Sequence, residues 1–412
     1  MTYSNMKLMK LGRKGWVAVL LAGFLSACGN KQENTSVPGG TESSAPLPTP
    51  PAVAECEPGI PGGRIVVTTF ADPKTFNPIT ANETSSTDIT LRMFFTLVIV
   101  DSPTEKARPG LAESWSVEPD NKTWTFHLRK GLRWSDGQPL TADDVVFTLN
   151  DVVYNPDIPN VTRDQFIMNG KKFMISKVDD YTFKVVTPEI YAPFVNFFGV
   201  MPIVPKHTLA KAVAEKQFLA AYGINSKPED VVCCGPFRLK DYKQGQYVML
   251  ERNPYFWEVD KKGQRLPYAD NVVFAIVPDM NAESLMFLAG KADLQERVRS
   301  EEYEHFQDEA KKGRFRVLDL GVSGDQDVIH LNENTNINEK TGKTHIEPYK
   351  LKWFRNQKFR QAVSYAIDRE SIVRSACAGH GQPNYSFVTP SATNWYNPNI
   401  KTYPYDPAKA KA

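Results

Sequence analysis

Two adjacent carboxylates, Asp143 and Asp144, are the first residues in the chain whose type and spacing suggest acid–base catalysis. They follow a turn sequence, "WSDG" at 134–137, and Asp144 falls three residues after Thr141, which is the spacing of a helix capping box. Negative charge in the first turn of a helix is favoured by about 0.3–1 kcal/mol, because unpaired N–H groups and the helix dipole attract it. Neighbouring helical residues also point about 100° apart, which suits a catalytic pair poorly. The two carboxylates are therefore predicted to stabilise the start of a helix.

Two other short motifs resemble catalytic ones and fail on one residue each. The sequence "GVSGD" at 321–325 contains Gly-x-Ser, but the wrong residue follows for a nucleophile elbow. The sequence "TGKT" at 341–344 ends like a phosphate-binding loop, but Ile337 stands where that loop requires glycine. No zinc-protease motif or dinucleotide glycine pattern occurs, and the six histidines are scattered. We therefore predict a protein that is not an enzyme and has no catalytic residue, metal or cofactor.

Composition and charge narrow the class of protein further. With 412 residues, of which 41% are hydrophobic, the chain can form two or three folded domains. Its 49 basic and 47 acidic residues give a formal charge of +2, and no basic block lies beyond the extreme N-terminus. Nucleic acid is therefore excluded as a partner.

The N-terminus has the features of an export signal. Basic residues precede a short apolar run, which ends in Leu25-Ser26-Ala27-Cys28. The run is too short to span a bilayer, which needs about 20 apolar residues. The last four residues resemble the bacterial lipobox, and this resemblance implies a signal peptide over 1–27 and lipid attachment at Cys28, with palmitate among the acyl groups. The alternative is an ordinary signal peptide with an incidental cysteine. Residues 28–62 are rich in Pro, Ser and Gly and are predicted to form a tether, so that the folded part begins near Gly63.

Hydrophobic periodicity predicts a mixture of strands and helices, and hence an α/β fold. Trp124, Phe126 and Leu128 alternate with polar residues in one predicted strand, and Tyr181, Phe183 and Val185 do so in a second. Further strands are expected at 64–69, 245–253 and 271–279. Helices are expected at 87–100, at 281–289 before Gly290, on both sides of Asp368, and after Asp406.

Four cysteines remain beyond Cys28, and export to an oxidising compartment permits disulfides. Cys233 and Cys234 are adjacent and bridge each other only with strain. Pairing of one of them with Cys56 or Cys377 stays open.

Four blocks in order resemble the extracellular solute-binding proteins of peptide-type ABC importers. They are 107–149 ("ARPGLAESWSVEPDNKTWTFHLRKGLRWSDGQPLTADDVVFTL"), 233–257, 266–294 and 354–373. The resemblance covers about 63–412 and implies a periplasmic-binding-protein-like fold of several lobes. It places lobe I at 63–101 and 190–320, lobe II at 102–189, and a partial lobe III at 321–412. It also implies a monomeric receptor, anchored by lipid at the periplasmic face of the cell envelope, which passes an oligopeptide to the permease subunits of an importer.

The resemblance further implies that the ligand's main chain pairs with backbone segments of lobes I and III. These segments are Asn82, Glu83, Thr84 and Ser85 in lobe I, and Gln326, Asp327, Val328 and Ile329 in lobe III. Gly235, in the family's Gly-Pro-Phe loop, is expected either to line the ligand site or to form a structural turn, and both alternatives stay open.

Other readings of the same sequence remain. Within the family, a nickel complex or an oligosaccharide is an alternative ligand, and a chaperone or interaction protein of the cell envelope is an alternative function. Asp406 begins a helix for which no end follows, so we expect a fragment of a longer product rather than a naturally short form with an incomplete third lobe. Gly29 is not the aspartate that retains lipoproteins at the inner membrane, which leaves the choice of membrane open.

Overall fold

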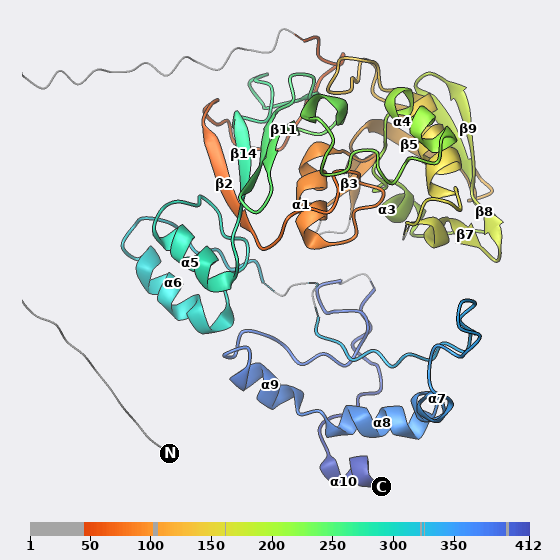
Figure 1. The fold of residues 1–412 in the computed structure, drawn as a ribbon, viewed down its shortest axis with the longest axis vertical. Helices are drawn as coiled ribbons and strands as arrows, with labels where there is room; N and C mark the ends of the chain where they lie inside the picture. The colour runs from red at the N-terminus through yellow and green to blue at the C-terminus, as the bar shows by residue number, and fades with distance from the viewer. Residues whose placement is uncertain (1–44, 102–105, 161, 322–323, 325, 393–394) are drawn as a thin grey trace, which may run out of the picture. The chain divides into compact units, whose positions relative to one another are not determined.

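The computed structural model describes residues 45–101, 106–160, 162–321, 324, 326–392 and 395–412 (Figure 1). The α-helices are α1 (Thr84–Met93), α2 (Ala142–Phe147), α3 (Phe194–Phe198), α4 (Lys206–Ala214), α5 (Met280–Leu288), α6 (Tyr303–Ala310), α7 (Pro348–Phe354), α8 (Gln357–Ala366), α9 (Arg369–Ser375) and α10 (Pro407–Lys411). The other helices are the π-helix η1 (Thr148–Val153) and the 3₁₀ helices η2 (Arg163–Phe166), η3 (Pro228–Asp230) and η4 (Ser300–Glu302). Within the described ranges, no helix combines the length and apolarity needed to cross a bilayer.

The strands form two four-stranded sheets and three short pairs. The strands are β1 (Ala52–Val53), β2 (Arg64–Thr69), β3 (Val98–Val100), β4 (Ala107–Pro109), β5 (Ala112–Val117), β6 (Thr123–Leu128), β7 (Ile167–Met168), β8 (Lys171–Lys172), β9 (Met174–Asp179), β10 (Thr182–Val186), β11 (Phe237–Lys243), β12 (Tyr247–Arg252), β13 (Glu258–Val259) and β14 (Asn271–Ile276). The mixture of sheets and helices confirms the predicted α/β class.

The first sheet joins segments that lie far apart in the sequence. Its order is β11-β12-β14-β2, in which β2 runs parallel to β14 and the other neighbours are antiparallel. Val67, Val248, Leu250 and Phe274 are among the residues buried in it. The strands predicted at 64–69, 245–253 and 271–279 are thereby confirmed within a few residues.

In the sequence, the strands of the second sheet lie between β2 and β11 of the first sheet. Its order is β5-β6-β10-β9, all antiparallel. Phe126 on β6 stands opposite Phe183 on β10, and the two buried rings stack with centroids 5.2 Å apart. The inward positions predicted at Leu128 and Val185 are buried as well, whereas Trp124 and Tyr181 are only partly buried against the same core. The predicted alternation is confirmed.

The helix predicted at 87–100 is shorter and earlier than expected. α1 covers Thr84–Met93, and Phe94 already has an extended backbone with ψ of 151°. Residues 98–100 instead form β3, which pairs with β4. The run Val98-Ile99-Val100 is β-branched throughout, which favours a strand over a helix. The helix predicted at 281–289 is confirmed as α5, and Gly290 follows it with a positive φ of 69°.

Residues 45–62 pack on the folded body, although the predicted tether extends to residue 62. β1 pairs in parallel with β13, and the N–H of Ala54 donates to the carbonyl of Val259 at 2.8 Å. Arg265 donates to the carbonyl of Ala45, and Pro48 is buried close to Gly131. A proline-rich chain is already extended, so it can add to existing strands without a core of its own. We call residues 45–62 the N-terminal strap.

The four described cysteines are free thiols, so neither pairing left open by the sequence is formed. Cys233 and Cys234 are buried, with 0% and 1% exposure. Burial raises the pKa of the Cys233 thiol to about 12, so the thiolate needed for disulfide exchange is scarce.

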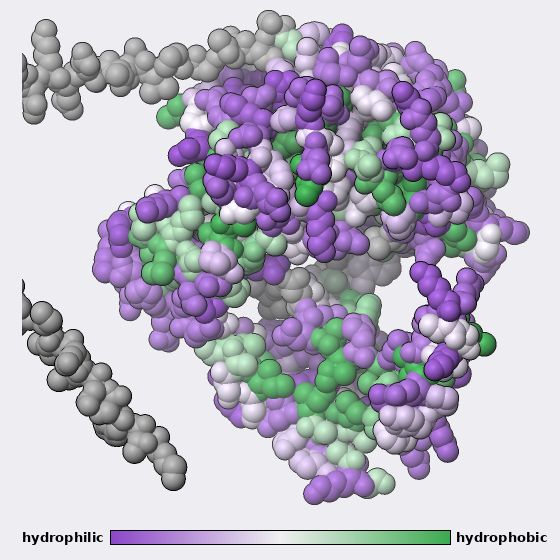
Figure 2. All heavy atoms as spheres, viewed as in Figure 1, coloured by the Kyte–Doolittle hydropathy of each residue, from purple (hydrophilic) through white to green (hydrophobic). Residues whose placement is uncertain are grey.

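The segment 326–412 is built from short helices with little buried surface. Asp368 caps α9 by accepting from the N–H of Ser371 at 3.0 Å, and Asp406 caps α10 by accepting from that of Lys409 at 3.0 Å. Both predicted caps are confirmed. Among the described residues of this segment, Thr389 alone is buried, and Figure 2 shows hydrophobic side chains on its surface.

The capping box predicted at Thr141 and Asp144 is present at the start of α2. The Asp144 carboxylate, 4% exposed, accepts from the N–H of Thr141 at 2.9 Å and from that of Lys206, at the start of α4, at 2.9 Å. It also accepts from the indole N–H of Trp134 at 3.3 Å. Asp143 points instead to the surface, where it pairs with Lys177 at 2.5 Å. Asp144 thus accepts from two backbone N–H groups and an indole, whereas Asp143 pairs with lysine side chains at the surface, so the two carboxylates do not form a catalytic pair.

We predict that Asp144→Ala lowers the free energy of unfolding by roughly 2–4 kcal/mol, because three donors around a buried position lose a charged acceptor. Asp143→Ala, the matched control, should cost less than about 1 kcal/mol, since its ion pair is exposed. Urea unfolding followed by circular dichroism measures both. Equal losses for the two variants would contradict the structural role given to Asp144.

We also predict that a chain starting at residue 63 is less stable than one starting at residue 45. Loss of the N-terminal strap removes several backbone hydrogen bonds worth about 0.5–1.5 kcal/mol each, so the unfolding free energy should fall by roughly 2–4 kcal/mol. Hydrogen exchange should rise at Glu258–Val259, which loses its partner strand. Identical melting temperatures and exchange rates for the two chains would show that the strap adds no stability.

Candidate ligand-binding site

The loop before α1 is fixed by one buried side chain, Asn77, which is 0% exposed. Its carbonyl oxygen accepts from the N–H of Ile79 at 3.0 Å, and its amide donates to the carbonyl of Ala221 at 3.3 Å. The backbone carbonyl of Asn77 also accepts from the N–H of Ala81 at 3.0 Å. These hydrogen bonds hold in place the loop that leads into residues 82–85, the residues predicted to bind ligand.

The four residues predicted in this loop divide into two exposed and two inward ones. Asn82 and Thr84 are exposed, whereas Ser85 is buried and donates to the carbonyl of Asp72 at 3.1 Å. The Glu83 carboxylate turns back into the loop and accepts from Ser86 and from the N–H of Lys74. Partial burial opposes ionisation of Glu83, but these hydrogen bonds outweigh it and lower its pKa. The side chains of Asn82 and Thr84 are thus exposed, whereas those of Glu83 and Ser85 shape the loop.

Gly235 lies in a position where only glycine fits. A Cβ there would stand 2.6 Å from the carbonyl carbon of Met93 at the end of α1. The N–H of Gly235 donates to the carbonyl of Met93 at 2.7 Å, and its own carbonyl accepts from the amide of Asn253 at 2.8 Å. These contacts favour the structural turn over a ligand contact. Gly235 and residues 82–85 also lie at opposite ends of α1, roughly 14 Å apart along a helix that rises about 1.5 Å per residue.

The residues predicted to bind ligand in lobe III lie outside the helices and strands. Gln326 is held by its side chain, which donates to the carbonyl of Phe387 at 2.7 Å and accepts from Asn384 at 2.6 Å. Asp327, Val328 and Ile329 are exposed. Main-chain pairing with a ligand requires backbone groups that no neighbouring strand already occupies, and residues 326–329 belong to no named strand.

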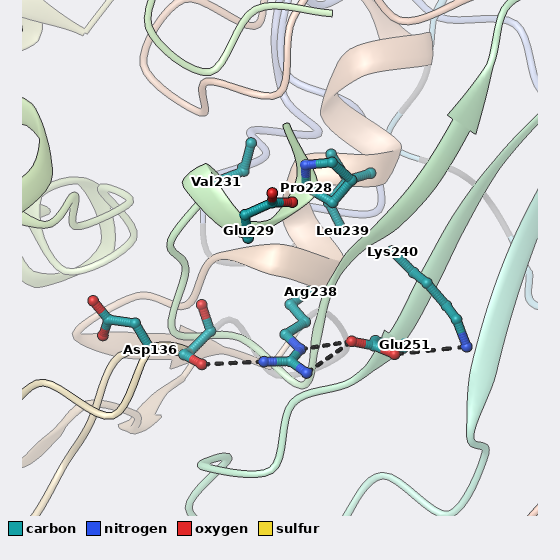
Figure 3. Close-up of a pocket in the computed structure, with 9 residues that line it drawn as sticks. Asp136, Pro228, Glu229, Val231, Arg238, Leu239, Lys240 and Glu251 are labelled. Carbon is teal, nitrogen blue, oxygen red and sulfur yellow. Dashed lines mark hydrogen bonds and ion pairs between the residues drawn. The ribbon is translucent and has the colours of Figure 1, made fainter. Parts of the chain in front are cut away.

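A pocket of about 410 Å³ lies where the turn 134–137 meets β11 and β12 (Figure 3). Arg238 donates two hydrogen bonds to Glu251, at 2.9 and 2.8 Å, and a third to the carbonyl of Ser135 at 3.4 Å. Lys240 lies 3.6 Å from Glu251 on the other side. These charged side chains already pair with one another and link the turn to the sheet. Few of their hydrogen-bonding groups are therefore left for a ligand.

No sequence motif marks Arg238 or Glu251. Arg238 and Glu251 are cross-strand neighbours in the register of β11 and β12, and opposite charges at such positions are the only signal that could have found them. Among the described residues, no group of three or more His, Cys, Asp or Glu side chains could hold a metal ion. Cys28, the predicted site of lipid attachment, lies outside the described residues.

Comparison with known proteins identifies the family. Residues 106–412 match the family described as "Bacterial extracellular solute-binding proteins, family 5 Middle". A "Probable ABC transporter-binding protein" of Deinococcus radiodurans is 30% identical over 358 residues, which cover 85% of this chain and 58% of that protein. The "Oligopeptide-binding protein AppA" of Bacillus subtilis is 29% identical over 407 residues, which cover 96% of this chain and 64% of that protein. The chain thus spans about three-fifths of the length of these relatives.

Solved structures share the fold. The structure of AppA from Bacillus subtilis in complex with a nonapeptide aligns with a TM-score of 0.65 and 27% identity, over 85% of this chain and 63% of that one. The periplasmic binding protein MelB from Agrobacterium fabrum, in complex with stachyose, aligns with a TM-score of 0.67 and 23% identity, over 88% and 55%, which shows the fold alone. "Heme-binding protein A" of Haemophilus influenzae is 30% identical over 74% of this chain and 52% of its own length.

These findings confirm the predicted fold and the prediction that the protein is not an enzyme, because the matching family is one of extracellular solute-binding proteins and the relatives are named for binding. The chain belongs to the family 5 bacterial extracellular solute-binding proteins.

Proposed function

We propose that this protein is a receptor that captures oligopeptides outside the cytoplasm and delivers them to the permease subunits of an ABC importer. The observation that carries the proposal is the likeness to AppA, whose solved structure holds a nonapeptide. Because the family also includes proteins named for heme and for other solutes, the ligand is the part of the proposal that most needs a test.

In the proposed binding mode, the main chain of the peptide pairs with backbone of this protein. Residues 82–85 support it because Asn77 fixes their loop and Asn82 and Thr84 are exposed. Residues 326–329 support it because they belong to no named strand and because Val328 and Ile329 are 47% and 66% exposed. Strand-like pairing gives affinity that depends little on the peptide's side chains.

We further propose that Cys28 carries a lipid that holds the protein, as a monomer, at the periplasmic face of the envelope. The sequence Leu25-Ser26-Ala27-Cys28 after an apolar run supports this anchor. With the N-terminal strap packed from residue 45, the 16 residues from Gly29 to Ser44 separate the anchor from the packed body. A chain of that length reaches at most roughly 60 Å.

We predict that the full chain binds a nonapeptide, and that methylating alternate backbone nitrogens of the peptide weakens binding about tenfold or more. Each lost main-chain hydrogen bond costs about 0.5–1.5 kcal/mol, whereas replacing one side chain of the peptide should change the affinity only a few-fold. Isothermal titration calorimetry measures these affinities. Val328→Pro, which removes an N–H in the proposed site, should also weaken binding, and Leu318→Pro, at another exposed position, serves as its control. Saturable binding of heme or stachyose without peptide binding would refute the proposal.

We predict that cells expressing the full chain incorporate radiolabelled palmitate into it, and that Cys28→Ser abolishes this labelling. Without the lipid, the protein should move from the membrane fraction to the released fraction, because no other segment is proposed to hold it. Cys56→Ser is the matched control and should keep both the label and the membrane attachment. Membrane attachment that survives Cys28→Ser would contradict the anchor.

A further inference from the structure

A buried carboxylate on α5 has one oxygen without a partner. Glu283 is 5% exposed, and its Oε1 accepts from the hydroxyl of Thr68 at 2.5 Å. Its Oε2 is buried and makes no hydrogen bond. An unpaired buried oxygen is costly, and more so on a group that carries charge. Such an atom therefore points to a donor that arrives from outside the folded chain.

A second buried acceptor lies near Ser284, the residue that follows Glu283. The amide nitrogen of Gln295 donates to the carbonyl of Arg297 at 3.0 Å and to the hydroxyl of Ser284 at 3.4 Å, whereas its Oε1 is buried and unpartnered. Ser284 follows Glu283 on α5 and donates in turn to Glu302 at 2.8 Å. The amide orientation is fixed by these bonds, so the oxygen of Gln295 is left as an acceptor.

The local charges favour a positively charged donor. Burial raises the pKa of Glu283, and repulsion from Glu296 and Glu302 adds to this effect. Arg92 pairs with Glu296 at 3.1 Å, and Arg299 pairs with Glu302 at 2.6 Å, so these cations are already engaged. Among the described residues, no cation forms an ion pair with Glu283. An added cation would offset both the burial and the repulsion.

The chemistry of the acceptors selects a nitrogen donor over a metal ion. Among the described residues, no group of three or more His, Cys, Asp or Glu side chains could hold a metal. A primary ammonium has three N–H donors and no acceptor, which suits two carbonyl-type oxygens. Exposed apolar side chains lie close in the fold: Met280 is one turn before Glu283 and 37% exposed, and Leu294, 45% exposed, bridges to Val67 next to Thr68. Figure 2 shows hydrophobic surface over α5, which would cover the methylene stem of such a group.

We propose that Glu283 and Gln295 form a subsite for a primary ammonium group, such as the lysine side chain of a bound peptide. This inference rests on the proposed peptide-binding function and assigns it a preference for cationic peptides. Gln295 is only partly buried, so its side chain is the one that moves to admit the ammonium.

The test compares two peptides that differ in one charge, Ala-Ala-Lys-Ala-Ala and the same peptide with Nε-acetyllysine. Calorimetry on the full chain should show about tenfold tighter binding of the free lysine peptide. Glu283→Gln should bring the ratio of the two affinities close to one, because it removes the charge and places an N–H₂ donor in the position of Oε2. Glu301→Gln, an exposed acid nearby, is the matched control and should keep the ratio.

Each outcome bears on a different statement. If both peptides bind the unaltered chain equally, or if Glu283→Gln keeps the ratio, the ammonium subsite is wrong and the peptide receptor stands. If neither peptide binds, the proposed function fails, and the subsite fails with it. Thermal unfolding checks that Glu283→Gln is folded. If it is not, Gln295→Ala, at a partly exposed position, must lower the ratio in its place or the subsite is overturned.

Discussion

The joining of α2, α4 and the turn at 134–137 depends on the burial of one carboxylate, Asp144. It binds the start of α2, the start of α4 and the indole of Trp134, so a single charged group joins three segments. Helix N-termini carry unpaired N–H groups, and a buried carboxylate between two of them satisfies both at once. The hydrogen bonds lower the cost of burying the charge but do not cancel it, since burial still raises the pKa of Asp144. Its position is therefore fixed by the need to keep every one of these bonds.

The segment held by Asp144 leads through backbone contacts to the candidate ligand loop. Ser135, next to Trp134, exchanges two hydrogen bonds with Cys233: its N–H donates to the carbonyl at 2.7 Å, and its hydroxyl accepts from the N–H at 3.0 Å. Two residues later, Gly235 bonds to the end of α1. The start of α1 carries the exposed Asn82 and Thr84. A short series of backbone bonds thus connects the capping box with the lobe I residues that we propose to contact the peptide.

Local patterns in the sequence predicted the parts of this structure that depend on local forces. Phe126 and Phe183 follow the period of a strand, and Thr141, Asp368 and Asp406 are cap residues, so each was found from its neighbours in the sequence. The N-terminal strap was missed because a proline-rich segment has no periodicity of its own, and only β13, about 200 residues away, makes it a strand. The pocket around Arg238 was missed because its pairs depend on strand register. At Gly235 the sequence left two roles open, since the close approach of Met93 is a tertiary contact.

Two buried carboxylates in this protein, Asp144 and Glu283, accept hydrogen bonds from different numbers of donors. This difference distinguishes a carboxylate that stabilises the fold from one that is a candidate for binding a ligand. Asp144 accepts from three donors, so nothing is left for a ligand to supply. Glu283 accepts from Thr68 alone and faces two further carboxylates, an arrangement that loses stability unless a cation completes it. In ligand-binding sites a buried polar group often lacks a hydrogen-bond partner within the protein, because the ligand supplies that partner. By that reasoning, the adjacent pair that suggested catalysis from the sequence belongs to the scaffold, and the isolated Glu283, which no motif marked, is the better candidate for recognition.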